Sequence, residues 1–214
     1  MSHTLHREGD RDSLSNDYIF LIMPENGFND ENSEERLRLA MDVLLKHNPV
    51  NFGDSKNGSK YTLHGKQAVL DAIEEKETIF AVYTTIEQVT AVLRDLKELD
   101  TGLSVTVSGL ADQLCSCARK AGLTPHTVSE SLGVWGDQER LPPAPVRELT
   151  TMCGHGLVAA NLVFDLLERV KTGRLTTEQA AEKMAECCVC GVFNPVRAQQ
   201  IIEGLLKSET EKSA

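Results

Sequence analysis

The sequence predicts an α/β protein: an N-terminal three-layer α/β domain with a mainly parallel sheet, followed by a small three-helix C-terminal domain. Short apolar runs alternate with amphipathic segments over the first 136 residues or so, the pattern of strands joined by helices. The runs Tyr18–Met23 and Thr78–Tyr83 are continuously apolar, which is typical of strands buried on both faces. Beyond the proline-rich stretch Leu141–Pro145 the pattern becomes helical.

The first strand, at 18–23, is followed by a helix that Ser33 can cap and whose apolar residues recur at helical spacing up to Leu45. Residues 48–60 are rich in Asn, Gly, Ser and Pro and predict a loop, and a shorter helix follows at 66–75. Thr85 and Gln88 form a capping box after the second strand. The helix that it opens leads to a third strand at 103–107. A strand, a helix and a strand in this order imply a parallel pair with a right-handed crossover.

A further helix at 110–121 and a strand at 126–135 complete the predicted α/β domain. In the C-terminal part we expect a helix at 155–171, a second helix that starts at the capping box Thr176–Gln179, and a third that starts with Asn194 as N-cap and Pro195 as first residue. The predicted divisions are a disordered leader (1–17), the α/β domain (18–140), a Pro-rich linker (141–149), a helical cysteine-bearing domain (150–207) and a frayed tail (208–214).

Composition and charge narrow the classes of partner. The formal charge of −10, without a stripe of Lys and Arg, excludes a nucleic-acid backbone as the expected partner. We expect no membrane association, because no run approaches the roughly 20 apolar residues that span a bilayer. The first 17 residues lack the apolar centre of a secretory signal, so a cytoplasmic location is expected. The six cysteines should therefore be thiols rather than a disulfide framework.

Four of the six cysteines, Cys153, Cys187, Cys188 and Cys190, fall at predicted helix ends and beside glycines. Thiolates that converge on one point, with close backbone N–H groups, are what an iron–sulfur cluster requires, and we predict a [4Fe–4S] cluster on these four residues. Cys188 carries an ambiguity, because it also continues the apolar face of its helix and can be a core thiol. Three ligands would leave one iron open, whereas four would favour electron transfer or a structural role.

Zinc would use the same cysteines, with His155 as a further candidate ligand in a mixed Cys/His tetrahedron. Three functions follow: a cytoplasmic cluster protein with a redox or Lewis-acid role, a zinc- or cluster-stabilised accessory or sensor protein without enzymatic activity, and a metal-free enzyme with Cys153 as nucleophile and His155 as its partner. The expected partner is a small molecule or a redox partner protein. Cys117 is predicted to be a core thiol.

Overall fold

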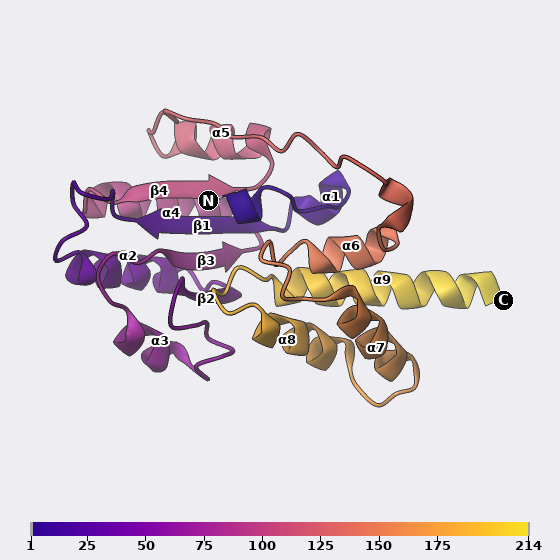
Figure 1. Ribbon diagram of the computed structural model, residues 1–214. Helices are drawn as coiled ribbons and strands as arrows, with labels where there is room; N and C mark the ends of the chain where they lie inside the picture. The colour runs from indigo at the N-terminus through magenta and orange to yellow at the C-terminus, as the bar shows by residue number, and fades with distance from the viewer. Residues whose placement is uncertain (1, 214) are drawn as a thin grey trace.

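The computed structural model describes residues 2–213 and contains one four-stranded sheet within that range (Figure 1). Its strands are β1 (Tyr18–Met23), β2 (Asn51–Asp54), β3 (Ile79–Tyr83) and β4 (Ser104–Ser108). The order across the sheet is β2-β3-β1-β4, and every neighbouring pair is antiparallel. With helices between β1 and β2 and between β3 and β4, this is the split βαβ, or ferredoxin-like, topology. Because many functions occur on this topology, it does not indicate one.

The antiparallel sheet corrects the prediction of a mainly parallel one. The inference from strand–helix–strand order was incomplete, because β3 and β4 do run in the same direction but β1 lies between them and pairs with both. The continuous apolar runs were misleading for a second reason. Helices cover both faces of this sheet, so its central strands are apolar throughout, as in a parallel sheet.

Alternate residues of β1 enter two separate cores. Phe20 and Ile22 pack with α2 (Glu34–Lys46), α4 (Ile86–Leu99) and α5 (Ala111–Lys120), near the short α3 (Lys66–Ala72). Ile19 and Leu21 face the other side of the sheet and pack against the C-terminal helices. The second helical layer therefore comes from the C-terminal third of the chain (Figure 1).

The C-terminal helices are α6 (Ala144–Thr150), α7 (Ala160–Lys171), α8 (Thr177–Cys187) and α9 (Pro195–Ser213). The predicted capping boxes at Thr85 and Thr176 are both confirmed. Asn194 also acts as predicted, since its Oδ1 accepts from the Arg197 N–H at 3.0 Å. Helix α7 begins at Ala160 and not at His155, because residues 151–156 form turns. None of the described helices is long and apolar enough to cross a bilayer.

Two predicted segments differ in the structure. Residues 48–60 contain strand β2, and residues 126–135 form an exposed loop instead of a strand, followed by the 3-10 helix η2 (Gln138–Arg140). The predicted linker at 141–149 overlaps α6, and the predicted frayed tail from 208 overlaps the end of α9. Met1 and Ala214, in the predicted leader and tail, lie outside the described residues.

Residues 2–17, for which a disordered leader was predicted, run between the sheet and the C-terminal helices. They contain the 3-10 helix η1 (Ser2–Thr4) and the short helix α1 (Arg11–Leu14). The Asp17 carboxylate is buried and accepts from Arg7 at 2.6 Å and from Arg197 of α9 at 2.9 Å. Polar contacts of this kind place the segment beside the two turns that carry the cysteines.

Candidate metal centre

Three segments that are far apart in the sequence meet at one point. His3 comes from η1, Cys153 and His155 from the turn after α6, and Cys188 and Cys190 from the turn after α8. The ligand atoms of His3, His155 and Cys190 all lie within 4.8 Å of one another, which is close enough to hold one metal ion. The chain therefore contains a possible His/His/Cys metal-holding group.

The two imidazoles are held in place by ring contacts. His3 stacks on His155 with a centroid distance of 4.5 Å and meets the Phe80 ring of β3 edge-on at 5.6 Å. Nδ1 of His155 lies 3.8 Å from Sγ of Cys190. Nε2 of His3 is buried and has no hydrogen-bond partner, so a nitrogen lone pair is available there. Burial and neighbouring positive charge lower the pKa of His3, which favours the neutral imidazole that binds metals.

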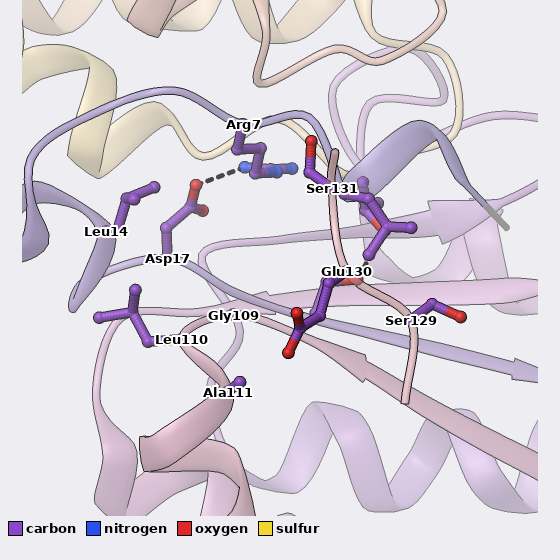
Figure 2. Close-up of a pocket in the computed structure, with 12 residues that line it drawn as sticks. Arg7, Leu14, Asp17, Gly109, Leu110, Ala111, Ser129, Glu130 and Ser131 are labelled. Atoms are coloured by element: carbon purple, nitrogen blue, oxygen red, sulfur yellow. Dashed lines mark hydrogen bonds and ion pairs between the residues drawn. The ribbon is translucent and has the colours of Figure 1, made fainter. Parts of the chain in front are cut away.

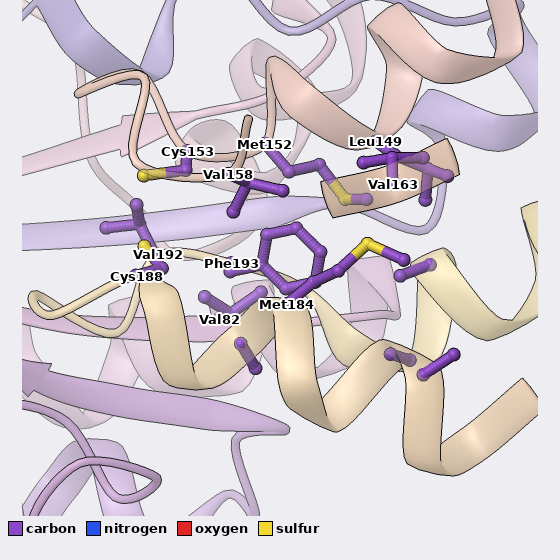
Figure 3. Close-up of a cluster of buried hydrophobic side chains, with 14 of the residues drawn as sticks. Val82, Leu149, Met152, Cys153, Val158, Val163, Met184, Cys188, Val192 and Phe193 are labelled. Atoms are coloured by element: carbon purple, nitrogen blue, oxygen red, sulfur yellow. The ribbon is translucent and has the colours of Figure 1, made fainter. Parts of the chain in front are cut away.

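Three thiols form a hydrogen-bonded row that ends at this group. Cys153 contacts Cys188, and Cys188 contacts Cys190. The hydrogen bond to Cys188, together with burial, raises the pKa of the Cys153 thiol. The contact with Cys153 lowers the pKa of Cys188, whereas the contact with Cys190 and burial raise it, and the net result is a pKa of about 12. The hydrogen bond with Cys188 lowers the pKa of Cys190, so the thiolate of this row forms most readily beside His155. Figure 3 shows Cys153 and Cys188 at one end of the buried apolar cluster.

Cys187 does not join the row. Its Sγ turns back to the Lys183 carbonyl oxygen, 3.4 Å away on its own helix. Of the four predicted ligands, the structure thus brings Cys153, Cys188 and Cys190 together and directs Cys187 elsewhere. Cys188 has both properties that the sequence suggested, since it is fully buried in the apolar core and in contact with two other thiols. Cys117 is buried in the other core, as predicted.

Close backbone packing fixes the two cysteine turns. A Cβ on Gly154 would lie 1.6 Å from the carbonyl oxygen of His3, so only glycine lets the N-terminal segment approach this turn. Gly191 has φ of +81°, and a Cβ there would lie 2.6 Å from the Phe52 carbonyl of β2. The glycines that the sequence places beside the cysteines therefore serve contact between backbones.

His3 is the site residue that the sequence did not indicate. It lies in a polar segment without periodicity that also contains His6, and neither histidine has a spacing that relates it to Cys190. Only the path of the N-terminal segment over the sheet edge brings it to the centre. Comparison of the chain with protein-family models, with curated proteins and with solved structures finds no match.

Proposed function

We propose that this protein binds a single transition-metal ion, zinc foremost, through His3, His155 and Cys190, and that Cys188, which contacts Cys190 but lies outside this group of three, moves in as the fourth ligand. The observation that carries the proposal is the convergence of imidazole and thiol groups from three segments on one point. Imidazole with thiolate is a ligand set typical of zinc.

The distances support one ion rather than a larger group. In a tetrahedral zinc site, Zn–S of about 2.3 Å and Zn–N of about 2.0 Å place sulfur and nitrogen roughly 3.6 Å apart. The observed separation of Cys190 Sγ and His155 Nδ1 is 3.8 Å. In a cubic cluster each thiolate binds a different iron, whereas the group with ligand atoms within 4.8 Å of one another consists of two imidazoles and one thiol.

The role that fits such a site is structural. Four protein ligands complete a tetrahedron and leave no position for a substrate. The ion would fasten the N-terminal segment to both cysteine turns. This agrees with the function of an accessory or sensor protein that folds around its metal.

Metal analysis with matched variants tests the proposal. Protein purified without oxygen should contain about one zinc per chain, and its cobalt-substituted form should show the visible bands of tetrahedral sulfur and nitrogen ligation. Cys190→Ser and His3→Ala should weaken metal binding by about ten- to a hundredfold or more. Cys187→Ser is the matched control, since it removes the neighbouring thiol that turns away, and it should leave affinity unchanged. Metal-free protein, or equal losses for Cys187→Ser and Cys190→Ser, would show the proposal to be wrong.

A [4Fe–4S] cluster is the second candidate, favoured by the buried row of three thiols. Cys153, Cys188 and Cys190 would be its ligands, and a cluster with three protein ligands would leave an iron open for Lewis-acid chemistry. Iron with an equal amount of acid-labile sulfide, lost in Cys153→Ser but kept in His3→Ala, would select this candidate. The opposite dependence selects the single ion. The metal-free enzyme has less support, because His155 faces Cys190 and Cys153 contacts Cys188.

A further inference from the structure

A second concave site lies on the other side of the N-terminal segment from the sheet centre (Figure 2). It is a pocket of about 220 Å³ between residues 4–7, the end of α1, the junction of β4 with α5, and the loop 129–131. Its volume is below the roughly 300 Å³ at which sites for drug-sized ligands begin, so it suits a smaller molecule. Ser108 and Gly109, where strand β4 leads into helix α5, both line this pocket.

The wall of the pocket contains a buried cation with an unused donor. The Arg7 side chain is only 5% exposed. Its two terminal nitrogens donate to Asp17 and to the Val192 carbonyl oxygen, whereas Nε is buried without a hydrogen-bond partner. An unpaired buried donor costs about 1–3 kcal/mol, and a ligand with an acceptor oxygen would remove that cost.

The N-terminus of α5 reinforces this preference for an anion. The helix is ten residues long, and its N-cap Leu110 makes no side-chain capping bond. Asp112 accepts from the first-turn N–H groups of Gln113 and of Asp112 itself, and its charge is balanced by Arg11. The N–H of Ala111, which lines the pocket, is left for a ligand, with the positive end of the helix dipole behind it.

The remaining lining limits the charge and shape of the ligand. Asp17 already neutralises Arg7, and Glu130 adds a negative charge at the exposed rim, so a dianion such as phosphate is disfavoured. Leu5, Leu14 and Leu110 supply apolar surface. Thr4 and Ser108 are tied to each other at 2.6 Å, which fixes the floor.

We propose that this pocket binds a small monocarboxylate with a short aliphatic part, whose carboxylate lies between Arg7 and the N-terminus of α5. The carboxylate could belong to a simple fatty acid or to an α-amino acid whose ammonium group faces Glu130. The fatty acid and the α-amino acid share the carboxylate and the short aliphatic part, and separate probes for each distinguish the two.

Four probes test the proposal on the full chain: isovalerate, L-valine and isopentyl alcohol, which share a branched aliphatic part, and inorganic phosphate. Calorimetry and the fluorescence of Trp135, the one tryptophan in the sequence, follow binding, because Trp135 belongs to the same loop as residues 129–131. Isovalerate or L-valine should bind saturably below about 10 mM, and the alcohol and phosphate at least tenfold more weakly. The NMR signal of the Arg7 Nε–H should shift with the bound carboxylate.

Two variants together separate a loss of carboxylate binding from a loss of folding. Arg7→Gln should weaken carboxylate binding at least tenfold, but it also removes the ion pair with Asp17. Ala111→Leu changes an exposed residue at the mouth of the pocket, should leave the thermal midpoint unchanged and should weaken binding at least tenfold by filling the space. The proposal is overturned by absence of saturable carboxylate binding, by equal binding of the alcohol, by tighter binding of phosphate, or by unchanged binding in Ala111→Leu. Because none of these readouts needs the metal, failure here is distinguishable from failure of the metal centre.

Discussion

Replacing Asp17 by Ala should be among the most destabilising single changes in this chain. Its carboxylate, with no exposed surface, accepts from Arg7 at 2.6 Å, from Arg197 at 2.9 Å and from the Asn194 amide at 3.0 Å. Removal leaves two arginine side chains, 5% and 1% exposed, without their shared counter-ion. Breaking one buried ion pair costs about 3–5 kcal/mol, because an uncompensated charge stays in the interior.

We therefore expect the free energy of unfolding to fall by at least about 3 kcal/mol. For a chain of this size that corresponds to a loss of about 6–20 °C in thermal midpoint. Urea unfolding followed by circular dichroism measures the difference. Asp112→Ala is the matched control, because it also removes an aspartate that is paired with an arginine. In that pair the side chains of Asp112 and Arg11 are both more than half exposed. Asp112→Ala should cost only a small fraction of the stability that Asp17→Ala costs, because it removes an exposed ion pair and an acidic residue in the first turn of α5. If Asp17→Ala lowered the free energy of unfolding by less than about 1 kcal/mol, the reasoning that Asp17 is the indispensable counter-ion of two desolvated arginines would be refuted.

Three further predictions concern backbone packing, capping and pH. Gly154→Ala should displace His3 and weaken metal binding about tenfold or more, because its Cβ would lie 1.6 Å from the His3 carbonyl oxygen. Gly204→Ala is the control, because the space around Gly204 in α9 is open, and it should leave metal affinity unchanged. Thr176→Ala should lower the free energy of unfolding by about 1 kcal/mol through loss of the α8 capping box. Burial and the nearby Asp54 raise the pKa of Glu77, so the folded state holds this proton more tightly than the unfolded chain does, and the residue's contribution to stability falls as pH rises through that interval. Glu77→Gln should flatten this part of a stability curve measured from pH 4 to 7; an unchanged slope would contradict the assignment.

Local signals in the sequence predicted most of the elements. The strand at 18–23, the capping boxes at Thr85 and Thr176 and the start of α9 at Asn194 depend on residues within one or two turns of each other, and the structure has all of them. The direction of the strands could not be obtained in this way. The strand direction depends on the position of β1 between β3 and β4. That position is set by pairing between strands far apart in the sequence, which the order of elements along the chain does not determine.

Strand β2 shows the same limit at shorter range. Its sequence Asn51-Phe-Gly-Asp54 has one large apolar residue and three residues with low strand propensity. It is a strand because β3 pairs with it and because the Asn51 amide donates to the Phe193 carbonyl oxygen, just beyond the cysteine turn. Residues 126–135 show the reverse case. Val128, Val134 and Trp135 favour a strand locally, but none of the strands that the structure describes pairs with this segment, and the three side chains are exposed.

The candidate site was likewise predictable from local sequence only in part. Crowding of cysteines near 153 and 187–190 was visible in the sequence, and three of those thiols do meet. Which cysteine turns away could not be read from the spacing, because Cys187 and Cys188 are adjacent and only the end of α8 decides between them. Helix α8 continues through Cys187, which keeps that side chain on the helix surface, and Cys188 is the first residue whose backbone departs from the helix.

The N-terminal segment connects these observations. A polar stretch cannot be held in place mainly by burial of apolar side chains, so it needs specific partners to offset the entropy lost on ordering. Here those partners are the imidazole stack at His3, the buried hydroxyl pair at Thr4 and the ion pair at Arg7, within five residues. Arg7 also donates to the carbonyl oxygen of Val192, two residues beyond Cys190. The proposed metal centre and the proposed carboxylate pocket therefore draw residues from the same short segment, His3 for the first and Thr4 and Arg7 for the second.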